Sequence, residues 1–259
     1  MKGVYAATMV LAMLFVSQVF AANLWYDNFN DNKLDPKYIV KYDPQEAGNG
    51  AKWVEEDGVL KQTEPVPGDA TYCIIEIPNA PEAIGALAKI RFDDYQDHDR
   101  SRAGVGVWLD PNDHYNGYTF VIHNRIQNGD VQFLNDHRAW DNAVKANFTV
   151  DVGQWFWMEV FIDPDKGEIY GKIWLDGDQE PKDWTIKDSY ASFGTPRDPT
   201  PFVGLNGGSG TSSGGGHSTA SFDEFIVFDA GGPQPTPVSL LGKLTTTWGA
   251  IKFKRSYYR

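Results

Sequence analysis

The stretch from Trp155 to Trp184 constrains the fold more than any other part of the chain. Aromatic and β-branched residues are concentrated in two runs, Trp157–Ile162 and Ile169–Leu175, and each run is too short for a helix of normal length. The residues between them, Asp163–Gly167, include the proline and glycine that suit a tight turn. The sequence therefore predicts a β-hairpin, with a second turn beginning at Asp176.

The two faces of this hairpin differ in character, because successive side chains of a strand point to opposite sides. One face mixes aromatic residues with Glu159 on the first strand and Lys172 on the second. Such a face meets solvent or a ligand, whereas an apolar face packs on a partner sheet. The apolar face of the first strand consists of Phe156, Met158, Val160 and Ile162.

The rest of the chain also predicts strands, recurring at intervals of roughly 10 to 20 residues and separated by turns. No convincing helical period interrupts them, so the pattern indicates an all-β sandwich. In the segment Gly104–Leu109, alternation predicts that Trp108 lies on the face opposite Val105 and Val107. Further strands are expected at 24–29, 53–54, 58–62, 71–77, 86–92, 117–124, 131–134, 202–206 and 220–229.

The first 21 residues have the organisation of a bacterial-type secretory signal peptide. Lys2 precedes an apolar run, and Val19–Ala21 offers small residues for cleavage after Ala21. An uncleaved membrane anchor is the alternative, although the apolar run is short for a span. We expect export, to the medium or the cell surface, and a mature domain covering residues 22–230.

A Pro/Gly linker at residues 231–239 separates this domain from a basic tail at 240–259. The tail is either a docking or sorting element or a disordered basic end, since its glycines and threonines lower helix propensity. Its larger apolar residues have spacings compatible with one helical face: Leu241, Leu244, Trp248 and Ile251.

Charge and cysteine content exclude several function classes. Between Ala22 and Gly231 the chain carries 17 basic and 35 acidic residues, a net charge of −18, which disfavours nucleic acid and anionic membranes as partners. Neutral glycans or bound cations fit better.

The single cysteine, Cys73, excludes an intrachain disulfide and is expected to be a buried strand residue.

Several short motifs, taken in order, resemble the concanavalin A-like, laminin G-like jelly-roll modules of secreted bacterial proteins. The likeness spans Asn23 to about Asp229 and rests on order and spacing, because each motif is loose by itself. The motifs are Trp25–Asp31, Lys52–Leu60, Gly104–Trp108, Asp113–Tyr118, Gly153–Trp155, Lys172–Gly177 and Phe222–Phe225.

This resemblance implies two antiparallel sheets, one of them concave, with sugar or protein ligands on the concave face or at the loop rim. Many members hold a structural calcium ion. Asp27 and Asp223 match the opening and closing motifs and are the candidate calcium ligands, with plain turn or surface roles as the alternative. Calcium takes six to eight oxygens, which two carboxylates and backbone carbonyls can supply.

An enzymatic role finds little support in the sequence. The β-glucanase branch of the fold carries Glu-x-Asp-x-(x)-Glu on one strand, and this chain lacks that signature. The nearest approach is Glu159 with Asp163, and Glu159 is better placed to pair with Lys172 across the hairpin. The five histidines are scattered, and no nucleophile elbow is present.

We therefore predict a secreted, non-catalytic glycan-binding module. A glycoside hydrolase or polysaccharide lyase on the same fold is the first alternative, and an extracellular adhesion or structural module is the second. Sugars stack on aromatic rings while polar side chains bond their hydroxyls. The candidate binding residues are Arg91, Trp108, His123, Glu159, Lys172 and Trp174 on one predicted face, with Arg102, Asn124, Arg125, Trp140 and Tyr115 at its rim.

Overall fold

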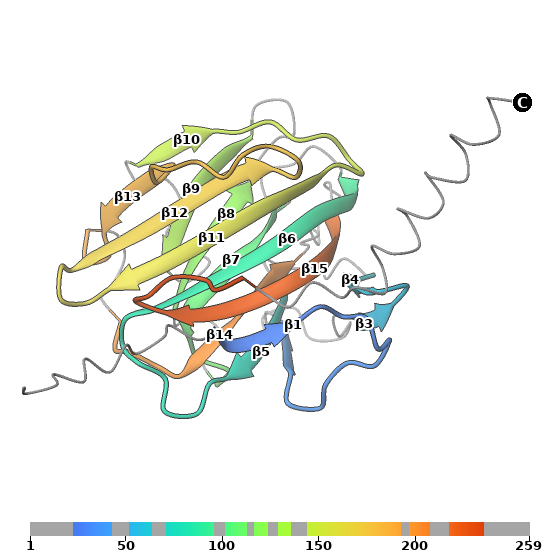
Figure 1. Cartoon of the computed structure of the whole chain (residues 1–259), viewed down its shortest axis with the longest axis horizontal. Helices are drawn as coiled ribbons and strands as arrows, with labels where there is room; N and C mark the ends of the chain where they lie inside the picture. The colour runs from blue at the N-terminus through green and yellow to red at the C-terminus, as the bar shows by residue number, and fades with distance from the viewer. Residues whose placement is uncertain are drawn as a thin grey trace, which may run out of the picture.

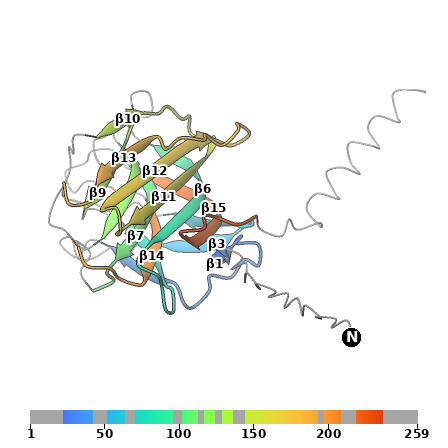
Figure 2. The same cartoon turned by 60° about the vertical axis from the view of Figure 1, so that its left-hand side comes forward.

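The computed structural model describes residues 23–42, 52–63, 71–95, 102–112, 117–123, 129–135, 144–192, 197–207 and 218–235. Within these ranges the chain forms β-strands and turns and no helix, which confirms the predicted all-β class. The strands form two antiparallel sheets that pack face to face as a jelly-roll sandwich (Figures 1 and 2).

The larger sheet, sheet A, has eight strands in the order β13-β12-β11-β6-β15-β4-β3, and β1 also pairs with β15. Its longest members, β6 and β15, lie beside each other, and the predicted hairpin forms β11 and β12. The bounds are β1 (Asn23–Asp27), β3 (Trp53–Glu56), β4 (Val59–Gln62), β6 (Ile84–Tyr95), β11 (Trp155–Asp163), β12 (Glu168–Leu175), β13 (Ile186–Ser189) and β15 (Ser218–Asp229).

The second sheet, sheet B, has seven strands in the order β10-β9-β8-β7-β14-β5-β2. In Figure 1 it lies behind β11, β6 and β15 of sheet A. The bounds are β2 (Ile39–Tyr42), β5 (Thr71–Glu76), β7 (Arg102–Leu109), β8 (Tyr118–His123), β9 (Asp130–Asn135), β10 (Lys145–Asn147) and β14 (Phe202–Gly207).

The core lies between the sheets and is built by alternation, as the hairpin predicts. Phe156, Met158, Val160 and Ile162 of β11 are all fully buried in it. Cys73 is buried there as a free thiol, and burial raises its pKa, so it has the structural role predicted for it. Burial of such apolar faces is the main force that holds the two sheets together.

Trp108 is an exception to the predicted alternation. The pairing of β7 with β14 shifts register before Leu109, and Trp108 has a left-handed φ of 52°. This bulge turns the indole into the core, where it is 1% exposed and donates a hydrogen bond to the Glu82 carbonyl oxygen at 3.0 Å. The prediction that Trp108 lies on a binding face is therefore wrong, because one extra residue in a strand reverses the faces beyond it.

Three strands were not expected from the sequence, and each lies at a sheet edge. β13 ends sheet A, whereas β10 and β2 end sheet B. Edge strands are short and carry charged residues, which blunts their tendency to pair with other chains. Short length and charged residues also weaken the alternation of apolar and polar residues by which strands are predicted, so these three strands were missed.

The two ends of the described domain are held together. The Asn23 side-chain amide donates to the Gln234 carbonyl at 3.1 Å, and the Gln234 backbone N–H donates to Asn23 Oδ1 at 2.9 Å. Because Asn23 begins β1, this clasp fixes both ends of the domain beside β15 of sheet A.

The tight fit of the core gives the first prediction. A Cβ added to Gly171 of β12 would lie 2.7 to 2.9 Å from ring carbons of Phe120 in the other sheet. Gly171→Val is expected to lower the free energy of unfolding by about 1–3 kcal/mol, because a packed core resists added volume. Chemical denaturation measures the change. Gln179→Val, at an exposed loop residue, is the control and should cost much less; equal costs would contradict the packing described.

Candidate functional site

The outward face of sheet A carries the ion pair that the hairpin predicts. Glu159 lies opposite Lys172 across β11 and β12, with Lys172 Nζ 3.5 Å from Glu159 Oε2. Lys172 also binds Glu180 Oε1 at 2.7 Å and lies over the Trp184 ring at 4.8 Å. The predicted role of Glu159 as a partner of Lys172 is thus confirmed.

Glu159 is an unusual carboxyl group in this position. Its side chain is 4% exposed, and burial raises its pKa to about 7, while Lys172 acts in the opposite direction. A carboxyl group with this pKa changes its charge near neutral pH. The stability of the sheet is therefore coupled to the protonation of Glu159.

Aromatic and aliphatic side chains surround this ion pair. Trp157 stacks on Trp174 with ring centroids 6.0 Å apart and planes inclined by 11°. Phe161 has stacking contacts with both Tyr170 (6.1 Å) and Phe228 (6.3 Å). We call this cluster the aromatic face; it consists of Tyr26, Leu87, Trp157, Phe161, Trp174, Ile226 and Phe228.

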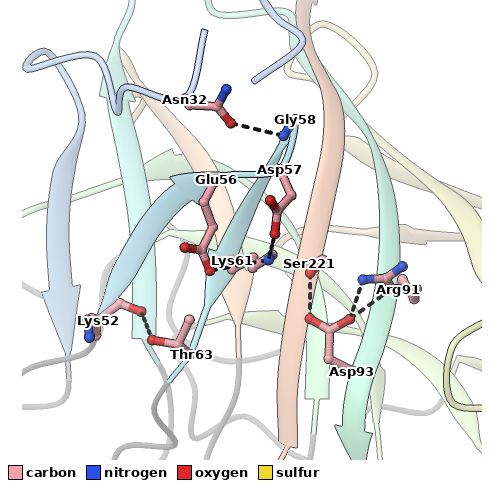
Figure 3. Close-up of polar contacts among 10 residues, drawn as sticks. All are labelled: Asn32, Lys52, Glu56, Asp57, Gly58, Lys61, Thr63, Arg91, Asp93 and Ser221. Atoms are coloured by element: carbon pink, nitrogen blue, oxygen red, sulfur yellow. Dashed lines mark hydrogen bonds and ion pairs between the residues drawn. The ribbon is translucent and has the colours of Figure 1, made fainter. Parts of the chain in front are cut away.

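Sheet A also carries paired charges and polar contacts on β3, β4, β6 and β15 (Figure 3). Arg91 binds the Asp93 carboxylate at 2.7 Å and lies 4.7 Å from the centroid of the Trp155 ring. The Ser221 hydroxyl donates to the same carboxylate from β15. On β4, Lys61 contacts both Glu56 and Asp57. Arg91 is therefore part of a closed network of side chains.

The two candidate calcium ligands do not come together as a metal site. Asp27 accepts hydrogen bonds from the Phe29 N–H at 2.9 Å and the Tyr38 hydroxyl at 3.2 Å. Asp223 lies 3.7 Å from Lys89 Nζ, and its pKa is raised by burial. No group of three or more His, Cys, Asp or Glu side chains in the described ranges is arranged to hold a metal. This pair of carboxylates does not fit a calcium ion.

A different carboxyl pair lies near Asp27. Glu55 is 5% exposed, and the Asp31 carboxyl group is one of its neighbours. Its Oε1 atom has no hydrogen-bond partner in the described part of the chain. Burial and the contact with Asp31 raise the pKa of Glu55 to about 7. Two acids in contact are stable only with a shared proton or a neighbouring cation.

The outward face of sheet B has a polar part beside an apolar cluster that contains Tyr72, Ile74 and Leu109. Arg102 of β7, Thr119 of β8, Gln132 of β9 and Asn206 of β14 are all at most 2% exposed. They alternate along their strands with core residues, so they point away from the core. We call this group the polar face.

Asn206 is the most unusual member of the polar face. Its side chain is 0% exposed, yet neither its Oδ1 nor its Nδ2 atom has a hydrogen-bond partner among the described residues. It lies opposite Gly104 of β7 and Tyr72 of β5. A Cβ on Gly104 would lie 2.0 Å from the Phe120 carbonyl oxygen, so this position cannot carry a side chain that reaches the amide.

An orphaned buried amide requires an explanation, because burial without hydrogen bonds costs free energy. Asn206 pairs with Gly104, Gly104 pairs with Val121, and Val121 pairs with Gln132, so Asn206 and Gln132 lie in one row across the sheet. Their backbones are three strand spacings apart, or about 14 Å. Donors and acceptors at both ends of this row suit a ligand that carries several hydroxyl groups.

The structure divides the predicted binding residues between two opposite faces. Arg91, Glu159, Lys172 and Trp174 lie on the outward side of sheet A, and Arg102 lies on the polar face of sheet B. His123 ends β8 opposite Arg102, whereas Asn124, Arg125, Trp140 and Tyr115 lie outside the described residues. The single predicted surface is thus two surfaces.

Sequence reasoning missed Asn206 and Gln132, although a signal was present. Asn206 ends an apolar strand immediately before a Gly/Ser-rich tract, where an amide is unusual. Its importance depends on facing Gly104, which is distant in sequence. Only the strand pairing reveals that contact.

Comparisons with known proteins identify the fold as concanavalin A-like. Three solved structures each match with a TM-score of 0.51: a xylan β-1,4-xylosidase from Bacillus halodurans C-125 (13% identity), a sialidase (13%) and lectin II from Ulex europaeus (9%). They cover 79%, 81% and 80% of this chain. The sequence itself matches no protein-family model and no curated protein sequence.

The chain corresponds to different shares of these proteins. It spans 39% of the xylosidase and 18% of the sialidase, but 99% of the lectin. At these identities the likeness defines the fold, which here is a concanavalin A-like jelly roll shared by lectins and by parts of glycan-cleaving enzymes. No helix in the described ranges is long and apolar enough to cross a membrane.

The buried Glu159 gives the second prediction. Its raised pKa means that folding stabilises the protonated form, so stability is lost as the pH rises from about 4.5 toward 7 and above. Glu159→Gln is expected to be nearly neutral at pH 5 and to stabilise the protein by about 1–3 kcal/mol at pH 8. Lys172 keeps Glu180 as its partner.

Urea denaturation at the two pH values measures this difference. Glu168→Gln is the control, because the pKa of that partly exposed carboxyl is lowered by Lys187 and the substitution should not stabilise the protein at pH 8. An effect of Glu159→Gln that is equal at both pH values would contradict the proposed titration.

Proposed function

We propose that the protein is an exported, non-catalytic carbohydrate-binding module that holds a neutral glycan on the polar face of sheet B. The observation that carries this proposal is the Asn206 amide, which is fully buried and without a hydrogen-bond partner among the described residues. A bound hydroxyl group would supply the missing partner. Export itself rests on the predicted signal peptide.

The chemistry of the polar face favours a neutral ligand. Amide side chains such as Asn206 and Gln132 both donate and accept, as sugar hydroxyls do. The charged groups nearby are of both signs: Arg102 and Lys145 are basic, and Lys145 lies 3.7 Å from Asp130. With the strongly negative domain around it, this face offers no excess positive charge for an anionic polymer.

The similar solved structures support the class of ligand and leave the activity open. Their names include a lectin and two glycan-cleaving enzymes, so the fold is compatible with binding and with catalysis. The choice of a binding module rests on the polar face, whose buried residues are mostly neutral amides and hydroxyls and lack a pair of carboxylates suited to hydrolysis.

Asn206→Ala separates a ligand-binding role from a structural one. The variant should bind the glycan at least tenfold more weakly, because a buried hydrogen bond to the ligand is lost. Its melting temperature should stay the same or rise, because no internal hydrogen bond is removed. The measurements are a screen of neutral polysaccharides by affinity electrophoresis, calorimetry on the retained ligand, and thermal melting.

Asn135→Ala is the matched control. Asn135 is equally buried, but it accepts a hydrogen bond from Arg197 Nε at 2.9 Å. That variant should melt at a lower temperature and keep its glycan affinity. The proposed site would be refuted if the intact protein retained no glycan, or if Asn206→Ala bound the glycan as tightly as the wild type.

A glycoside hydrolase or lyase is the second candidate, and the raised pKa of Glu159 favours it. A carboxyl group with a pKa of about 7 is suited to donate a proton to a leaving group. However, Glu159 and its neighbour Glu180 both contact Lys172, so the two carboxyl groups belong to one ion-pair group. Release of reducing ends from the retained polysaccharide that stops in Glu159→Gln would favour the enzyme over the binding module.

Calcium is expected from the resemblance, and Glu55 with Asp31 fits it better than Asp27 with Asp223. The buried Glu55 Oε1 without a partner is an available oxygen ligand, and calcium accepts carboxylates together with backbone carbonyls and water. A bound ion would neutralise the two acids and hold the segment after β1 against the β3–β4 hairpin.

Thermal melting tests this assignment. Calcium should raise the melting temperature of the wild-type protein above its value in a chelator, and it should have little effect on Glu55→Gln. In the chelator at pH 8, Glu55→Gln should melt higher than wild type, because the pKa of about 7 means that ionising Glu55 costs stability. Asp223→Asn is the control, and calcium should still raise its melting temperature. If calcium no longer stabilised Asp223→Asn, the assignment to Asp27 and Asp223 would be favoured instead.

A further inference from the structure

The aromatic face of sheet A has no role in the proposed glycan site, since the polar face is on the other sheet. It is a hydrophobic cluster separate from the sandwich core. Leu87 and Ile226 are buried within it, whereas Tyr26, Trp157 and Phe161 are only partly buried. The three partly buried rings leave the outer side of the cluster partly accessible to solvent.

The arrangement of the rings suits a peptide better than a sugar. A sugar ring stacks flat against the face of an aromatic ring. Here the ring faces already contact each other: Trp157 stacks on Trp174, and Phe161 lies between Tyr170 and Phe228. Apolar side chains can pack between and against such rings without an open ring face.

The described chain ends beside this surface. Gln234 is clasped to Asn23, and Asn23 is the register partner of Phe228 in β15. Residues 236–259 follow. A helix over 240–252 would be about 20 Å long, and the sheet from β15 to β12 is about 14 Å wide. The described chain therefore ends near the aromatic face, and the residues that follow it are numerous enough to cross that face.

Charge complementarity supports the same occupant. The tail carries five basic residues and no acidic ones, namely Lys243, Lys252, Lys254, Arg255 and Arg259. On the outward side of sheet A, Lys89 lies near both Asp176 and Asp223, and Lys172 lies near both Glu159 and Glu180. Glu159 is partly protonated near pH 7, but the other three carboxylates, Asp176, Asp223 and Glu180, still outnumber the two lysines.

We propose that the basic tail docks in cis on the aromatic face and places Leu241, Leu244, Trp248 and Ile251 against its rings. This docking is independent of glycan binding, because the polar face belongs to the other sheet. It gives the tail a stable position next to the clasp that ends the domain.

Hydroxyl-radical footprinting of the intact mature chain tests the docking, because it reports the accessibility of individual side chains. In the tail variant Leu244→Asp/Trp248→Asp, Tyr26, Trp157 and Phe161 should react at least threefold faster than in wild type. Phe202, a partly buried outward residue of sheet B, should not change. Tyr257→Asp, which lies in the tail outside the apolar stripe, should behave like wild type.

The substitutions lie outside the folded domain, so the melting temperature of the domain should fall only slightly if at all. Unchanged reactivity of all three aromatic residues in Leu244→Asp/Trp248→Asp would refute the docking. A change that appears only at high protein concentration would show that the tail binds a second copy, and that result would also overturn docking in cis.

Discussion

The pairing of β6 with β15 is the contact on which the rest of the architecture depends. Both strands have twelve residues, and they pair from Ile84 opposite Asp229 to Tyr95 opposite Ser218. Inward they present apolar residues to the core, and outward they present charged residues and three of the seven members of the aromatic face. A slip of one residue would exchange the two sides along their whole length. Bulges at two points absorb the mismatch between the strands, and the one at Glu224 lets Phe222 and Phe225 both reach the core.

The sequence was sufficient to predict the parts of this fold in which local pattern and tertiary environment agree. The hairpin of β11 and β12, its buried face and the Glu159–Lys172 pair follow from alternation alone. Trp108 could not be placed, because the bulge that turns it inward is determined by the register with β14. The edge strands β2, β10 and β13 were missed because a strand with one neighbour needs little hydrophobic patterning.

The two outward faces illustrate why a site is harder to predict than a core. On sheet A the rings stack on each other and the charges pair with each other, so residues that seemed available for a ligand are already in contact with protein. On sheet B the informative feature is an amide that nothing in the described chain satisfies. A sequence records which side chains are present, whereas the number of their hydrogen bonds depends on neighbours such as Gly104 that are distant along the chain.

The clasp between Asn23 and Gln234 has a mechanical consequence. A pull applied through the C-terminal segment is passed to β1 and from there to the long strand β15, along the side of sheet A. If the chain is tethered at that end, load enters at one border of the sandwich and sheet B lies away from the line of force.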